Sequence, residues 1–135
     1  MRATVTIRLG AIAMSLGIAG CAPEEQTNTA RNDYMTFCAD CHGPSGKGDG
    51  PAAAGMTPKP VDITRLAVAN GGKFDKMGAM QHITGYTMGR SESPMPVFGD
   101  QLDGRTVMYD AGDGKPVATS ARLVQLVEYV ERMQK

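Results

Sequence analysis

The clearest hydrophobic pattern of the chain lies near its C-terminal end, over residues 120–133. Apolar side chains recur there at intervals of three and four, which is the spacing of one face of an α-helix. They are Leu123, Leu126, Val127, Val130 and Met133. Ser120 or Thr119 can cap the first turn, because a hydroxyl accepts a hydrogen bond from a backbone amide there. We therefore expect a helix that packs one face on a core.

A second helical pattern covers residues 29–41, and Thr29 is a suitable N-cap for it. Side chains at helical spacing share one face of this segment: Ala30, Tyr34, Phe37, Cys38 and Cys41. The two thiols therefore point where the apolar side chains point.

Weaker patterns lie between these two helices. Residues 61–71 favour a short helix or turn, and residues 73–84 a further helix, although Gly78 weakens the latter by about 1 kcal/mol. Residues 105–110 and 115–119 flank a Gly-rich turn and are typical of a β-hairpin. The expected fold class is all-α, a small domain of three to five helices, with room for a small β-hairpin before the last helix.

Residues 1–20 are typical of an export signal. Arg2 and Arg8 give a positive start, and the apolar run that follows is too short to span a bilayer. The run ends in Ile18-Ala19-Gly20-Cys21, which resembles the lipobox of bacterial lipoproteins, where cleavage before the cysteine leaves a thiol that carries lipid. We expect a lipoprotein signal peptide over 1–20 and lipidation of Cys21. An ordinary signal peptide with Cys21 left free is the alternative.

The domain organisation follows from this signal. Residues 21–28 are polar and without periodicity, so we expect a lipidated cysteine and a flexible tether. Residues 29–135 form one domain. Such a protein is held on the periplasmic side of a bacterial membrane, and Ala22 favours the outer membrane over the inner one.

The amino-acid composition indicates a small apolar core and argues against nucleic-acid binding. The chain has no Trp, three Phe and four Tyr in 135 residues, so a domain this small buries little apolar surface by itself. Two of its 14 basic residues fall in 1–20, which leaves 12 basic against 14 acidic side chains. No basic stripe or tail indicates nucleic-acid binding.

The motif that carries chemistry is Cys38-Ala39-Asp40-Cys41-His42, which reads C-x-x-C-H. This is the signature of covalent haem attachment. Two thiols on one helical turn can each add to a vinyl group of one porphyrin, and the histidine that follows can bind the iron. A buried haem would also supply the core that the composition lacks.

Two other uses of a C-x-x-C pair are less consistent with this chain. A thioredoxin-like pair would follow a strand and helix alternation, which the sequence before Cys38 lacks. A structural zinc site needs a second pair of ligands, and the remaining Cys21 and His82 do not repeat the spacing.

With these flanking features the chain resembles a class I c-type cytochrome with a single haem, in a bacterial lipoprotein form. The resemblance implies haem c bound through thioethers to Cys38 and Cys41, with His42 as an axial ligand of the iron. It also implies that the carbonyl of Pro51 accepts the second N–H of His42. In the family a small residue and an aromatic, here Ala30 and Tyr34, form the seat of the C-terminal helix, where Tyr129 can pack.

Met95 is the expected second axial ligand. It lies between two prolines in Pro94-Met95-Pro96-Val97-Phe98, and in the family the ligand commonly appears as Met-Pro followed by an aromatic. Met88 and then Met80 are the next candidates, and His82 would give iron held by two histidines.

The resemblance implies electron transfer by a haem iron that alternates between Fe(III) and Fe(II). It implies no enzyme activity and no small-molecule substrate, because both axial positions are filled. The expected partners are redox proteins that dock transiently. Two alternatives remain: a haem protein that binds or senses a ligand, and a haem subunit of a larger respiratory oxidoreductase complex.

Overall fold

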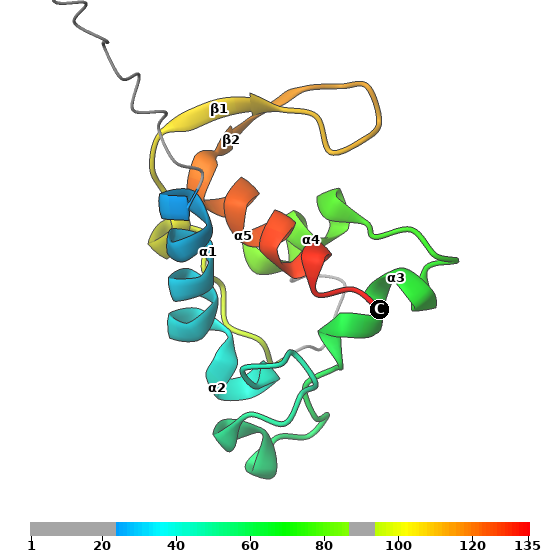
Figure 1. Cartoon of the computed structure of the whole chain (residues 1–135). Coiled ribbons are helices and arrows are strands. Elements are labelled where there is room, and N and C mark those ends of the chain that lie inside the picture. The colour runs from blue at the N-terminus through cyan, green and yellow to red at the C-terminus, as the bar shows by residue number, and fades with distance from the viewer. Residues whose placement is uncertain (1–23, 87–93) are drawn as a thin grey trace, which may run out of the picture.

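The structure, a computed structural model, describes residues 24–86 and 94–135 (Figure 1). In chain order its elements are α1 (Glu24–Phe37), α2 (Ala39–His42), the 3-10 helices η1 (Pro51–Gly55) and η2 (Ile63–Arg65), α3 (Leu66–Ala69), α4 (Lys76–Ile83), the 3-10 helix η3 (Asp100–Leu102), β1 (Thr106–Tyr109), β2 (Val117–Ser120) and α5 (Ala121–Arg132). The strands lie at one end of the molecule, and α2 with the loop after it lies at the other (Figure 1).

The crossing of α1 and α5 forms the centre of the core. The rings of Tyr34 and Tyr129 meet there with centroids 5.4 Å apart, as the resemblance implies, and Ala30 is buried beside them. Leu126 and Val127 are fully buried. The core cluster also contains buried residues of α2, η2, α3, α4, η3 and α5 and the residue Phe74 before α4; its further members are Ala39, Ile63, Ala67, Phe74, Met80, Ile83, Leu102, Leu123, Val124 and Val130.

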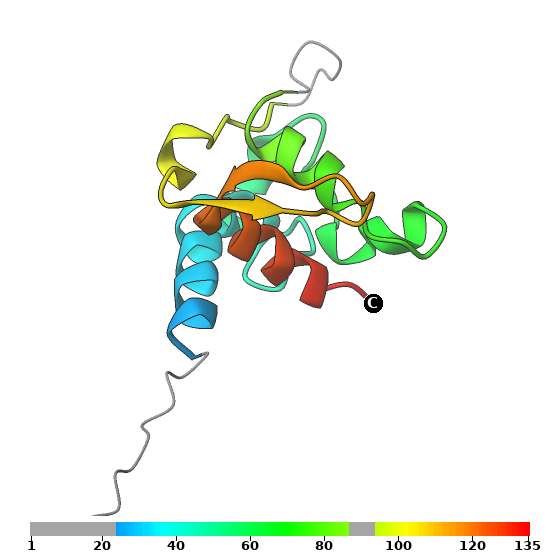
Figure 2. The ribbon, with the colours of Figure 1, turned by 90° about the horizontal axis from the view of Figure 1, so that it is seen from above.

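The all-α prediction is wrong, because the described part of the chain also contains a two-stranded antiparallel sheet. The strands pair Thr106 with Ser120 and Tyr109 with Val117, close to the expected hairpin. Asp110 explains the turn: its carboxylate accepts hydrogen bonds from the amides of Gly112, Asp113 and Gly114. A view from above shows the hairpin over α5, which contacts both strands (Figure 2).

The first helix differs from expectation at both ends. It begins at Glu24, so Thr29 is not its N-cap and residues 24–28 are helical rather than part of a flexible tether. Near its C-terminal end the helix breaks at Cys38, whose φ of −117° and ψ of −37° separate α1 from α2. The break changes the direction of the chain where the attachment motif begins.

The remaining helices lie where their patterns predict them. Residues 61–71 contain η2 and α3, and α4 lies within 73–84, where the Asp75 carboxylate accepts a hydrogen bond from the amide of Gly78. Ser120 stands at the N-cap position of α5 but makes no capping bond; its hydroxyl binds the carbonyl of Leu102 instead.

Cys21 and the signal segment 1–20 lie outside the described residues. Among the helices that are described, none has the length and apolar character that a membrane crossing requires.

The α1–α5 core predicts a clear difference between two aliphatic truncations. Leu126→Ala should lower the free energy of unfolding by about 2–5 kcal/mol, because it leaves a cavity at a fully buried position. Val68→Ala should change it by less than about 0.5 kcal/mol, because that side chain is 53% exposed. Urea unfolding followed by circular dichroism measures both, and equal effects would contradict the assignment of the core.

Candidate haem attachment site

The motif residues lie on one helical turn, formed by Cys38 and α2, directly after the break that ends α1. The amide of Cys38 donates to the carbonyl of Tyr34 at 2.9 Å, and the carbonyl of Cys38 accepts from the amides of Cys41 at 3.2 Å and His42 at 2.8 Å. Both thiols are free and half-buried. The structure therefore brings together two reactive sulfurs and an imidazole at the end of one helix.

The imidazole of His42 is held by a residue other than the expected one. Its Nδ1 lies 3.2 Å from the carbonyl oxygen of Val61, not at the carbonyl of Pro51. Pro51 begins η1 next to Gly50, whose amide binds the carbonyl of Cys41, so this part of the loop packs on the backbone of α2. The correction leaves the chemical function of the bond intact, because a carbonyl at Nδ1 fixes the tautomer and leaves Nε2 for a metal.

Burial controls protonation at the motif. It lowers the pKa of His42, an effect that the hydrogen bond to Val61 opposes and the charge of His82 reinforces. Burial, with help from the negative charge of Asp33, raises the pKa of Cys38 to about 12. At neutral pH the imidazole is therefore uncharged and able to bind a metal, and the Cys38 thiol keeps its proton.

The loop that follows the motif can fold back on it only because of glycine. A Cβ on Gly50 would overlap the carbonyl oxygen of Asp40, and one on Gly48 would overlap that of Pro60. Gly48 also has a φ of +76°, which side chains disfavour. Its amide donates to the carbonyl of His42 at 2.8 Å. These contacts bring residues 60–61 back to the imidazole.

Tyr34 connects the core to the motif. Its hydroxyl donates to the carbonyl of Gly43, the residue after His42, at 2.7 Å, and the side chain is fully buried. Burial raises the pKa of this phenol well above its usual range, so it remains a donor. The sequence indicated a core aromatic here but gave no sign of the hydroxyl's partner.

Met95 is half-buried and packs against the core cluster. Phe98 holds its segment: the amide of Phe98 donates to the carbonyl of Ile83 at 2.9 Å, and its ring lies 5.8 Å from that of Phe37, the last residue of α1. The segment of Met95 is thus tied to the helix that leads into the motif.

The other candidate ligands fall in three different places. Met80 is 4% exposed and belongs to the core, which is the ordinary role of a methionine. Met88 lies outside the described residues. His82 is half-buried on α4, near enough to His42 for its charge to lower the pKa of that imidazole.

The residues present fit a covalently bound haem. Free thiols at the required spacing, a neutral imidazole oriented through Nδ1 and a half-buried Met95 would hold it. Within the described ranges, no group of three or more His, Cys, Asp or Glu side chains could hold a metal ion by themselves.

Two glycines of the loop provide a matched test of its packing. Gly50→Ala should lower the free energy of unfolding by about 1–3 kcal/mol, because the new methyl group meets the carbonyl of Asp40. Gly55→Ala should not, because nothing lies within 4 Å of its Cβ position. Thermal unfolding of the two variants measures the difference, and a stable Gly50→Ala protein would show that the loop does not pack on α2 as described.

Removing the hydroxyl oxygen of Tyr34 tests the hydrogen bond that connects the core to the motif. Tyr34→Phe should lower the free energy of unfolding by about 1–3 kcal/mol, because the carbonyl of Gly43 loses its buried donor. Tyr86→Phe is the control, since that side chain is 83% exposed and should have no effect. Denaturant titration distinguishes them, and identical curves would argue against the hydrogen bond.

Comparison of the chain with models of known protein families, with curated proteins and with solved structures finds no match.

Proposed function

We propose that this chain carries one haem c, joined by thioethers to Cys38 and Cys41, and transfers electrons. The observation that supports the proposal most is the helical turn on which both thiols and His42 lie, with Nδ1 of His42 held at 3.2 Å by the carbonyl of Val61. Haem ligands are typically oriented in this way, through a hydrogen bond at the nitrogen away from the metal.

The axial ligands in this proposal are His42 and Met95. When bound, the haem supplies a one-electron couple between Fe(III) and Fe(II), which a histidine and a methionine commonly accompany in electron-transfer proteins. The chain contributes orientation: the carbonyl of Val61 holds the imidazole of His42, and the ring contact of Phe98 with Phe37 holds the segment of Met95 against the end of α1. With both axial positions filled, no position is left for a substrate, so the proposed activity is not enzymatic.

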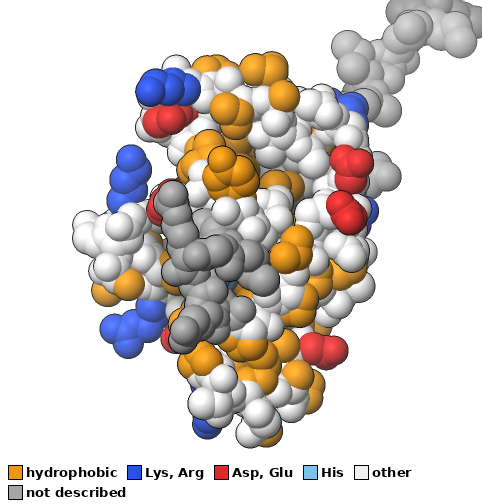
Figure 3. Space-filling model, turned by 180° about the vertical axis from the view of Figure 1, so that it is seen from behind, with side chains coloured by type: hydrophobic (Ala, Val, Ile, Leu, Met, Phe, Trp, Pro, Cys, Tyr) orange, Lys and Arg blue, Asp and Glu red, His pale blue; other side chains and the backbone are white. Residues whose placement is uncertain are grey.

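The proposed partners are redox proteins that dock briefly. Val61 and Val97 are 60% and 45% exposed. The carbonyl of Val61 holds His42, and Val97 lies two positions after Met95. Figure 3 shows hydrophobic side chains at several places on the face opposite that of Figure 1. Small apolar contacts of this kind suit weak, short-lived complexes.

The proposed location is the periplasmic side of a bacterial membrane, with lipid on Cys21. The lipobox-like Ile18-Ala19-Gly20-Cys21 supports this assignment, and it accounts for the cysteine that haem attachment does not use.

Export in a bacterial host that can mature c-type cytochromes tests attachment and anchoring separately. We expect a coloured protein that keeps its haem in a denaturing gel, and Cys41→Ser should weaken that attachment. Cys21→Ser should keep the covalent haem but move the protein from the membrane to the soluble fraction. A folded, colourless wild-type protein would refute the proposal.

His82 is the alternative second ligand, because its charge acts on His42 in the structure. The two possibilities predict different spectra. With Met95 bound, Met95→Ala should abolish the sulfur-to-iron charge-transfer band of the ferric protein, and His82→Ala should leave it unchanged. The opposite result, a wild-type protein without that band and a spectrum that changes only in His82→Ala, would assign the position to His82.

A further inference from the structure

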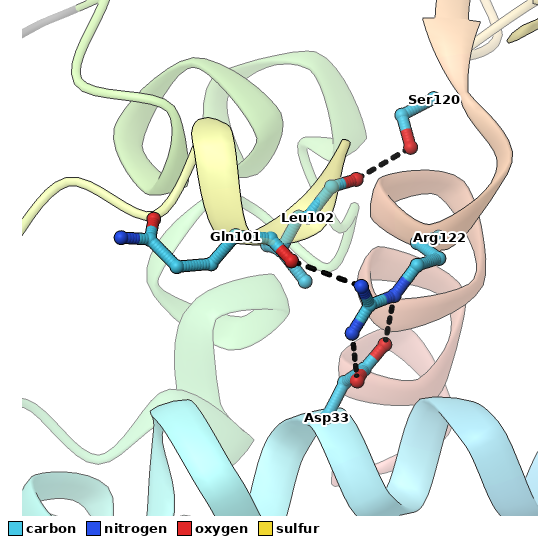
Figure 4. Close-up of polar contacts among 5 residues, drawn as sticks. All are labelled: Asp33, Gln101, Leu102, Ser120 and Arg122. Atoms are coloured by element: carbon cyan, nitrogen blue, oxygen red, sulfur yellow. Dashed lines mark hydrogen bonds and ion pairs between the residues drawn. The ribbon is translucent and has the colours of Figure 1, made fainter. Parts of the chain in front are cut away.

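A network of polar contacts joins α1, η3, β2 and α5 (Figure 4). Arg122, in the first turn of α5, is its centre. Its Nη2 and Nε donate to the two carboxylate oxygens of Asp33 on α1, at 2.6 and 3.1 Å. Its Nη1 donates to the backbone carbonyl of Gln101 in η3 at 3.0 Å. One guanidinium thus binds two segments that lie far apart in the sequence.

The Asp33 carboxylate is buried, because the residue is only 6% exposed. A buried carboxylate needs a charged partner with good geometry, and a two-pronged guanidinium meets that need more fully than an ammonium group does. The two bonds to Asp33 therefore fix the guanidinium of Arg122 relative to α1. Its third hydrogen bond, to the carbonyl of Gln101, then fixes η3 relative to α1.

The η3 helix follows Met95 in the chain and fixes the C-terminal end of its segment to the core. Leu102 is buried, its amide donates to the carbonyl of Phe98 at 3.1 Å, and its carbonyl accepts from the hydroxyl of Ser120 at 2.5 Å. Only six positions separate Met95 from Gln101. A shift of η3 would move the thioether relative to the end of α1, where the attachment motif begins.

We propose that Arg122 is a positioning residue, which sets the place of the Met95 segment against the helix that carries the haem-attachment motif. This inference rests on the proposed function, because it assigns Met95 a task at the iron. In this proposal Arg122 acts through its hydrogen bonds to Asp33 and Gln101.

Arg122→Lys is the primary variant. Lysine keeps a positive charge beside Asp33, but it cannot make two parallel bonds to the carboxylate and a third to Gln101. In the ferric holoprotein, added imidazole competes with Met95 for the iron. We expect Arg122→Lys to raise the affinity for imidazole by about tenfold, the effect of losing one hydrogen bond to a charged group. Lys76→Gln is the matched control. It removes an ion pair between Lys76 on α4 and Glu131 on α5, the helix that also carries Arg122, and it leaves the hydrogen bonds of η3 given above in place.

A double variant tests whether Arg122 acts by holding η3 in place or only by neutralising the buried charge of Asp33. The double substitution Asp33→Asn with Arg122→Gln removes the buried carboxylate charge together with its cationic partner, and it removes the guanidinium that binds η3. It should also bind imidazole more tightly, even where its urea midpoint equals that of Arg122→Lys or exceeds it. Imidazole affinity equal to wild type in either Arg122 variant would overturn the proposal, as would an equal rise in Lys76→Gln.

Hydrogen exchange provides a readout that does not need the iron. The amide of Leu102 should exchange faster in Arg122→Lys, whereas that of Val127, in the middle of α5, should not. Unchanged exchange at Leu102 would overturn the proposal. A protein that shows the faster exchange but no sulfur ligation would instead refute the part of the proposed function that assigns Met95 to the iron, so the two failures are distinguishable.

Discussion

The buried contact of Tyr34 is the interaction on which the rest of the structure depends. Its ring packs on Tyr129 where α1 crosses α5, and its hydroxyl binds the carbonyl of Gly43 at the end of the attachment motif. The same side chain thus belongs to the core and to the site. Because a buried carbonyl without a donor is costly, the helix crossing and the turn with His42 are energetically linked.

Three separate contacts place the functional groups around that point. The glycine loop returns Val61 to the imidazole, Phe98 meets Phe37 at the end of α1, and Arg122 ties η3 to Asp33. Each contact joins a segment without regular secondary structure, or a single 3-10 turn, to a helix of the core. A chain poor in large apolar side chains therefore builds its site by fastening loops to two crossed helices.

The sequence predicted those parts of the fold that have a local signal. Leu123, Leu126 and Val127 recur at helical spacing, and α5 lies there. The hairpin is indicated by the Gly-rich turn between residues 105–110 and 115–119. The sequence does not predict the start of α1 at Glu24, because residues 24–28 are polar and carry no apolar face. The all-α prediction is wrong because the hairpin, which local sequence signals indicate only weakly, is a regular part of the fold.

The site was predictable only where side-chain chemistry decides it. Thiols and an imidazole at fixed spacing identify a motif, and the structure brings them together. The partner of His42 is Val61 and not the expected Pro51, because every residue carries a carbonyl and residue type gives no information about which one approaches. Asp33 and Arg122 are 89 positions apart, so one sequence contains no sign of their pairing.

The last two residues of the chain, Gln134 and Lys135, bind the segment that follows Val61. The Gln134 side chain accepts from the amide of Ala67 and donates to the carbonyl of Ile63, and the amide of Lys135 donates to the carbonyl of Thr64. They fasten the segment directly after Val61. An affinity tag joined directly to Lys135 would disturb these contacts and, through residues 62–67, the carbonyl of Val61 that holds the imidazole. Purification tags for this protein should therefore be placed on a long linker.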